Sequence, residues 1–298
     1  MRDYDEWSAT CDTLHAHTQV LGKLAVALAP PEPQLQHTAL RLTARGWETR
    51  PLSSPNGSRS FGVALDLHAH EAVVEHADGR VQRIALTPNR AVADVTSDVL
   101  AAVRGIAGDV EINPKPQEVA WETPLDEDTG HATYDPAAVE DYFRAATSAA
   151  LVLEAFRAPW RGRSTPVNAW WGHLDLAVNL FSGRPAQPPS DDFLMRNGGD
   201  AEQIAVGWWP GDERHPSPAF FGYAYPAPAD VAERDVSPGH YDEALGEYVL
   251  EMAAAAATPD PHGTALDFAR AVGRQCMTAC EWDPALAGSL DGTPPPVT

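Results

Sequence analysis

The sequence has few cysteines, and it has no long apolar run. Its three cysteines are an odd number spread thinly over 298 residues, so a disulfide framework is not expected. Cys276 and Cys280 lie four residues apart within a helical pattern, and we interpret both as buried thiols that pack as small hydrophobic side chains. No stretch of eighteen apolar residues occurs and the first ten residues are polar and acidic, which predicts neither a transmembrane span nor a secretory signal.

Basic residues are also scarce. Against 42 acidic residues there are 21 basic ones, which gives a formal charge of −21 and a pI near 4.7. Such a chain repels phosphate backbones and anionic lipid, so neither nucleic acid nor a membrane is an expected partner. We expect a cytoplasmic protein with a small-molecule substrate, and the composition leaves its oligomeric state open.

Several familiar catalytic and nucleotide-binding motifs are missing. The sequence contains no cysteine–histidine spacing of a zinc site, no phosphate-binding loop, no dinucleotide fingerprint and no nucleophile elbow. The commonest nucleotide-dependent and acyl-transfer functions are therefore not expected, and we predict no organic cofactor.

The order of helical and alternating patterns predicts an α+β fold. Residues 11–29 have helical spacing, residues 38–86 contain segments that alternate between apolar and polar side chains, and residues 92–106 return to helical spacing. Residues 135–160, 167–252 and 263–282 repeat that order. We therefore expect two pseudo-equivalent halves, each an antiparallel β-meander flanked by helices, packed as one unit. The expected boundaries are 1–125 for the first half, 126–290 for the second and 291–298 for a disordered tail.

One face of the first predicted helix carries three polar side chains of different chemistry. His15, Gln19 and Lys23 are spaced by four residues, so they follow one another along the same helix face. An imidazole, an amide and an ammonium are unusual in a segment otherwise rich in Leu and Ala. The pattern is compatible with a polar pocket wall and with a solvated stripe.

The stretch from 170 to 185, WWGHLDLAVNLFSGRP, predicts a strand with a candidate site. On a strand, Trp171, His173 and Asp175 point to the same side. An aspartate beside a histidine can orient it as a base, and both can bind a metal. The alternative is a polar pair at a solvated rim. His68, His70 and His76 would also share a strand face, but HAHE is typical of a turn, which disfavours a metal site there.

Several segments together resemble a known family. CDTLHAHTQVLGK, TARGWETRPL, HATYDP, SRSTPVNAWWGHLDLAVNLFSGRPA, GWWPGD and AFFGYAYPAP occur in this order over nearly the whole chain. They are similar to a bacterial family, common in actinobacteria, that is catalogued as domain of unknown function 5996. The resemblance implies no established activity. Its matching positions include His15, Gln19, Lys23, Asp175, Ser182, Gly183 and Arg184.

The resemblance also implies three family histidines that this chain lacks. The matching positions are Gln34, Asn168 and Ala201, while His37 and Glu202 remain. A metal site of imidazole, carboxylate or thiolate ligands needs three or four such groups, and an amide oxygen is a weaker ligand. We therefore expect no metal. The alternative is a relocated site built from His37, His173, Asp175 or Glu202.

These observations predict a small-molecule enzyme of bacterial metabolism, specialised metabolism included. It would be a lyase, an isomerase or cyclase, or a hydrolase that uses acid–base chemistry in a tryptophan-lined pocket. Two alternatives are a metal-dependent oxygenase or hydrolase and a non-catalytic ligand-binding or partner protein. The expected catalytic residues are His15, Lys23, Asp175 and Glu202. The expected substrate-binding residues are Gln19, His37, Asn168, Trp171, His173, Arg184, Trp209 and Tyr225.

Overall fold

The computed structural model describes residues 1–57 and 59–288, and the chain divides into two compact units. Unit 1 comprises Met1–Glu32, Gln36–Thr147 and Ala169–Asp175, and unit 2 comprises Pro33–Leu35, Ser148–Asn168 and the chain from Leu176 onward. The main change of unit therefore follows Thr147, whereas the change of half predicted from the sequence follows residue 125. The predicted tail, 291–298, lies outside the described residues.

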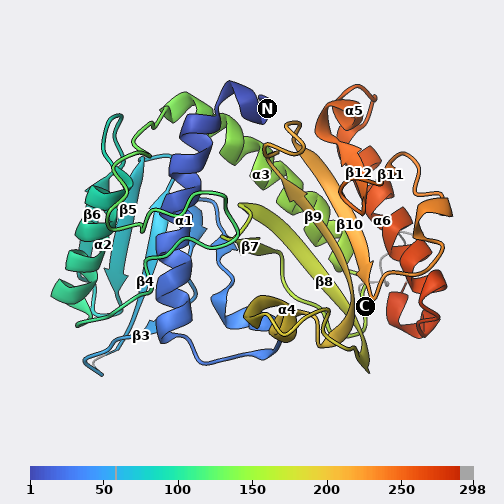
Figure 1. Ribbon diagram of the computed structural model, residues 1–298, viewed down its shortest axis with the longest axis horizontal. Helices are drawn as coiled ribbons and strands as arrows, with labels where there is room; N and C mark the ends of the chain where they lie inside the picture. Colours follow the sequence, from blue (N-terminus) through green and yellow to red (C-terminus); the bar gives the residue numbers. More distant parts are fainter. Residues whose placement is uncertain (58, 289–298) are drawn as a thin grey trace, which may run out of the picture. The chain divides into compact units, whose positions relative to one another are not determined.

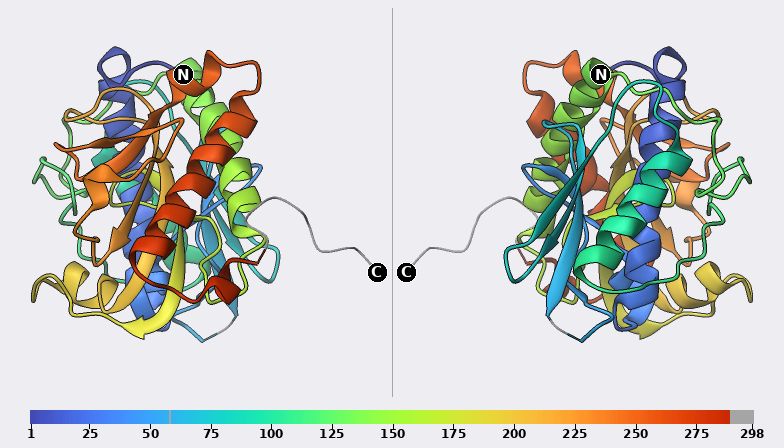
Figure 2. Two further views of the ribbon diagram at one scale, coloured as in Figure 1. Left: turned by 90° about the vertical axis from the view of Figure 1, so that its right-hand side faces the viewer. Right: turned by 90° about the vertical axis from the view of Figure 1, so that its left-hand side faces the viewer.

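Unit 1 contains a six-stranded antiparallel sheet with two helices packed on it. Helix α1 spans Ser8–Leu28 and α2 spans Val92–Ile106, and both contact the sheet as well as each other (Figure 2). The strands follow in the order β1-β2-β4-β5-β6, with β3 paired to β4. Their bounds are β1 Arg41–Leu42, β2 Gly46–Glu48, β3 Leu52–Ser53, β4 Ser60–Asp66, β5 Glu71–His76 and β6 Val81–Ala85, and short 3₁₀ helices cover Tyr4–Glu6 and Pro33–Thr38.

The hairpin between β5 and β6 shows how the sequence sets the sheet register. Asp78-Gly79 is a turn pair that hairpins prefer because its second residue takes a positive φ, and Gly79 has a φ of +93°. The turn sets Glu75 opposite Val81. Val63 and Leu65 of β4 then lie opposite Val74 and Ala72 of β5, and all four side chains are buried.

Unit 2 contains the second six-stranded sheet, in the order β11-β12-β10-β9-β8-β7. Helix α6, Pro261–Ala279, contacts β9, β10 and β12 and so covers one face of it (Figure 2). Gly222 on β10 allows this packing, since a Cβ there would lie 2.7 Å from Val272 of α6. The remaining elements are β7 Asn168–Trp170, β8 Asp175–Pro185, α4 Phe193–Gly198, β9 Ala201–Trp209, β10 Ala219–Tyr225, β11 His240–Asp242, β12 Glu247–Glu251 and α5 Met252–Ala256, with 3₁₀ turns at Val231–Glu233 and Pro284–Ala287.

The α+β class and the doubled order of elements are confirmed. Each half has a long helix, six antiparallel strands and a closing helix. The second half is not a simple meander, because β12 pairs with β10 and leaves β11 at the edge. No helix within the described part of the chain is both long and apolar enough to cross a membrane.

The single strand predicted from Trp170 onward is wrong. β7 ends at Trp170, residues 171–174 form a turn, and β8 begins at Asp175. Leu174 has a φ of +55°, a left-handed conformation that interrupts a strand. His173 and Asp175 therefore do not share a strand face, and His173 lies on the turn.

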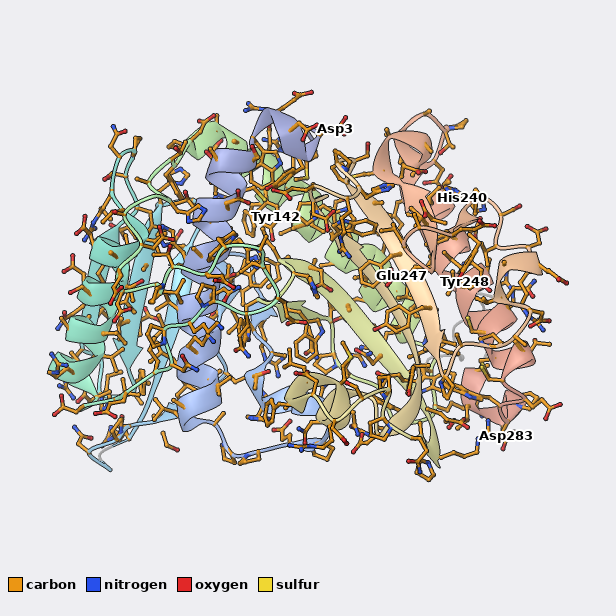
Figure 3. All side chains as sticks on the ribbon, in the orientation of Figure 1. Asp3, Tyr142, His240, Glu247, Tyr248 and Asp283 are labelled. Carbon is orange, nitrogen blue, oxygen red and sulfur yellow. The ribbon has the colours of Figure 1, made fainter. Side chains whose placement is uncertain are left out.

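Helix α3, Pro136–Arg157, begins as the sequence predicts, since the Asp135 carboxylate accepts a hydrogen bond from the Ala137 N–H at 3.0 Å. On its first half, Tyr142 (labelled in Figure 3) accepts a hydrogen bond from Trp47 Nε1 at 3.0 Å. Both side chains are fully buried. Burial raises the pKa of Tyr142 well above its usual value, so the hydroxyl stays protonated.

We predict that Tyr142→Phe lowers the free energy of unfolding by about 1–3 kcal/mol, because it leaves the buried Trp47 N–H without its acceptor. Urea denaturation at pH 7 measures the change. Leu151→Ala on the same helix is the control, since Leu151 is 65% exposed and its loss should change stability by less than about 0.5 kcal/mol. Equal stabilities of Tyr142→Phe and the wild type would contradict the prediction.

Candidate functional site

The polar face predicted on α1 is covered by a long irregular segment. Residues 107–135 connect α2 to α3 without any helix or strand, and Figure 1 shows this green segment running alongside α1. Ordered loops of this length are uncommon in compact domains and usually carry function. Five side chains of the segment contribute to the candidate site: Gln117, Glu118, Trp121, Asp128 and His131.

Gln19 fixes the segment onto the helix. Its side-chain amide donates to the Gln117 carbonyl at 2.8 Å, and its Oε1 accepts from the Gln117 N–H at 2.9 Å. The side chain thus pairs with the backbone N–H and C=O of one residue, as a neighbouring strand would. Lys23 Nζ adds a hydrogen bond of 2.7 Å to Gln117 Oε1.

Trp171 forms the second wall of the site. Its indole lies on Gly22, where a Cβ would be 2.2 Å from the ring, so the close approach requires glycine. Trp171 Nε1 donates to the Thr38 carbonyl at 3.0 Å. Lys23 Nζ lies 5.4 Å from the ring centroid, within the range of a cation–π contact.

His15 is held in one tautomer and kept neutral. Its Nε2 lies 2.8 Å from the Trp171 carbonyl oxygen; a carbonyl only accepts, so Nε2 carries the proton and Nδ1 keeps a lone pair. Desolvation lowers the pKa of His15 to about 4.

Asp128 and His131 form a carboxylate–imidazole pair. Asp128 Oδ2 lies 2.6 Å from His131 Nδ1, and Oδ1 accepts from the Gly130 and His131 N–H groups at 3.0 Å each. The Asp128 side chain is 3% exposed and that of His131 is 23% exposed. Because the carboxylate binds the Nδ1 proton, Nε2 of His131 is left as an acceptor on the open side.

Trp121 joins the two imidazoles. Its ring meets His15 edge-on at 5.9 Å between centroids and lies 4.8 Å from that of His131. Both histidines therefore contact the same indole. A small molecule beside Trp121 would meet an apolar surface and two imidazole nitrogens that can accept a proton.

Glu118 and the turn at residues 171–174 close one side of the site. Glu118 has a φ of +60°, and its carboxylate lies on Gly172, where a Cβ would be 1.9 Å from Oε2. Its Oε1 is 3.8 Å from His173 Nδ1, and the His173 side chain is 56% exposed. Glu118 and Leu174 both hold a positive φ, an arrangement that costs energy and occurs often at functional sites.

A second buried histidine lies on another face of α1. His17 is 2% exposed, and within the described residues its Nδ1 has no hydrogen-bond partner. Desolvation, followed by the positive charge of Arg90, lowers the pKa of His17 to about 4, although Asp128 opposes that shift. His17 is therefore neutral at physiological pH.

Only some of the site residues predicted from the sequence lie close together in the structure. His15, Gln19, Lys23 and Trp171 lie together in unit 1, with His173 beside them. Asp175 is buried and raises the pKa of Tyr142, and it is not among the groups that shift the pKa of His15. His37 accepts a hydrogen bond from the Glu32 N–H at 3.1 Å, and desolvation lowers its pKa.

The other predicted residues belong to unit 2. Glu202 accepts hydrogen bonds from Ser182 Oγ at 2.9 Å and Arg184 Nε at 2.7 Å, and Arg184 also donates to the Cys280 carbonyl. Trp209 contacts His215 and Phe221. Tyr225 donates to the Gln187 carbonyl, and Asn168 is buried at the start of β7. Catalytic or binding roles for these residues stay predictions.

The positions of the replaced histidines also lie in unit 2. Gln34 donates to Asp200 Oδ1 at 2.5 Å, accepts from Arg163 and has a φ of +51°. Ala201 follows Asp200 at the start of β9. Across residues 1–57 and 59–288, no three His, Cys, Asp or Glu side chains are grouped so that they could hold a metal ion.

Sequence reasoning missed the five side chains of the 107–135 segment. Two signals were present: an irregular stretch of this length between two helical patterns, and the HATYDP segment that contributes to the family resemblance. Neither signal identifies the face of α1 that the segment covers.

The comparisons with known proteins agree with the resemblance. A family model described as "Family of unknown function (DUF5996)" matches residues 2–288. Neither the curated proteins nor the solved structures contain a significant match to the chain.

The two neutral histidines predict a loss of stability on acidification. Their pKa values of about 4 in the fold lie below about 6.5, the value in an unfolded chain. Between these values the unfolded state binds more protons, so the free energy of unfolding falls as the pH falls. Glu247 acts oppositely, because burial raises its pKa to about 7 and the folded state then binds the extra proton.

Comparing variants separates these contributions. We predict that His15→Gln and His17→Gln each flatten the pH dependence of the unfolding free energy between pH 4.5 and 6, by up to about 1.4 kcal/mol per pH unit. Urea denaturation at several pH values measures the slope. His262→Gln is the exposed control and should leave it unchanged. Unchanged slopes in both test variants would show that these imidazoles titrate normally in the fold.

Proposed function

The chain belongs to the family of unknown function DUF5996, and from the geometry of unit 1 we propose that it is an enzyme that transfers protons on a small organic molecule. The observation that carries this proposal is the pairing of His131 with Asp128 beside the neutral imidazole of His15. Both imidazoles contact the indole of Trp121, which is half-buried.

His131 is the proposed general base. A base needs a lone pair directed at the substrate and a partner that stabilises the imidazolium formed when the proton arrives. Asp128 supplies that partner at 2.6 Å, and its two backbone hydrogen bonds hold the carboxylate in place. The His131 side chain is 23% exposed, which supports contact with a bound molecule.

His15 has a different role in this proposal. A neutral imidazole with its proton bound to the Trp171 carbonyl can accept a hydrogen bond through Nδ1 but does not add charge. His15 would orient a donor group of the substrate while His131 accepts the proton.

The experiment uses proton exchange as its readout. Wild-type protein is incubated in D₂O with a panel of small carbon acids, including keto acids and β-hydroxy acids, and loss of C–H signals is followed by proton NMR. We predict that His131→Gln and Asp128→Asn slow the exchange by about 10²–10⁴-fold, the usual contribution of a positioned acid or base.

His240→Gln is the matched control, because His240 is an exposed histidine of unit 2 (Figure 3). It should exchange at the wild-type rate. Exchange at the wild-type rate in both His131→Gln and Asp128→Asn would refute the assignment of His131. Binding of panel compounds without exchange would support the ligand-binding alternative instead.

A further inference from the structure

The chain contains only two lysines, Lys23 and Lys115, against nineteen arginines. Every ion pair found within the described residues uses an arginine or a histidine as its cation. Arginine keeps its proton in proteins, whereas a buried lysine can lose it. Lys23 on α1 therefore differs from the arginines of this chain, because its side chain can lose its proton.

Lys23 is buried, and no carboxylate within residues 1–57 and 59–288 forms an ion pair with it. The residue is 3% exposed, and its amine contacts Gln117 Oε1 at 2.7 Å and the Trp171 ring at 5.4 Å. A buried lysine is normally paired with a carboxylate. Desolvation lowers the pKa of Lys23 to about 8, so about one amine in ten is neutral at pH 7.

The surroundings favour reaction at this amine over anion binding. A site built for a carboxylate or a phosphate would gain more from arginine, which forms paired hydrogen bonds. A neutral amine in an apolar environment is instead the usual form of a lysine that attacks carbonyl carbon. Gln19 and Lys23 both bind Gln117, so the amine lies on the helix face that also carries His15.

We propose that Lys23 forms a Schiff base with an aldehyde or keto group of the substrate. The neutral amine attacks the carbonyl carbon and forms a C–N bond. The amine nitrogen gives up two protons, and the carbonyl oxygen leaves as water. Protonation of the imine nitrogen then acidifies the neighbouring C–H, which a base can deprotonate. This proposal rests on the proposed acid–base function and names carbonyl compounds as its substrate class.

Reductive trapping tests the proposal on the intact wild-type protein. Glyoxylate or pyruvate is added at pH 7 with cyanoborohydride, which reduces an imine to a stable secondary amine, and mass spectrometry locates the adduct. We expect Lys23 to be modified at least about tenfold faster than Lys115, because a lower pKa gives more neutral amine at pH 7. Lys115 is an internal control in the same chain.

Two further measurements make each outcome decisive. Carbon-13 labelling of lysine gives two side-chain signals, and that of Lys23 should titrate near pH 8. Lys23→Arg keeps the positive charge and should remain folded by circular dichroism, while proton exchange on the carbonyl compounds of the panel is lost. Modification of Lys115 with Lys23 unmodified, or titration of Lys23 near pH 10.5, would overturn the proposal.

The trapping result is independent of His131. His131→Gln should still form the Lys23 adduct, since imine formation does not require this base. If Lys23 is not trapped but His131→Gln still abolishes proton exchange, the Schiff base is wrong and the acid–base function stands. If Lys23 is trapped and His131→Gln exchanges normally, Lys23 reacts with carbonyls and the base has been misassigned.

Discussion

The paired hydrogen bonds between the Gln19 side chain and the backbone of Gln117 hold the candidate site together. Residues 107–135 have no helix or strand to satisfy their backbone groups, so each buried peptide needs another partner. Gln19 provides a donor for the backbone carbonyl of Gln117 and an acceptor for its backbone N–H. Once residue 117 is fixed on α1, Glu118 reaches Gly172 and Trp121 reaches His15.

The same contact explains how a very acidic chain maintains a site of low charge. The formal charge of −21 lies mainly on exposed side chains, whereas α1 carries two neutral imidazoles, on different faces, and one buried amine. Burial disfavours the charged form of each group. Lys23, with a pKa of about 8, can release a proton near neutral pH while the two imidazoles stay neutral, at a cost in stability that the rest of the fold must offset.

Regular patterns in the sequence predicted the regular parts of this site. Spacing of four residues placed His15, Gln19 and Lys23 on one face of a helix, and the alternating pattern predicted the antiparallel strands of unit 1. The turn at 171–174 was missed because WWGHLDLAVNLF alternates like a strand. Leu174 takes a left-handed conformation, and a leucine in the sequence does not indicate one. Gln19 and Gln117 are 98 residues apart, and no local pattern predicts which helix face an irregular segment will cover.

Amide hydrogen exchange at Gln117 tests the central claim most directly. If the Gln19 pair fixes the segment, the Gln117 amide is protected in the wild type, and Gln19→Ala accelerates its exchange by at least about tenfold while the amides of α1 stay protected. Gln82→Ala, at an exposed position of β6, should leave the rate unchanged. Equal protection of the Gln117 amide in Gln19→Ala and the wild type would contradict the account.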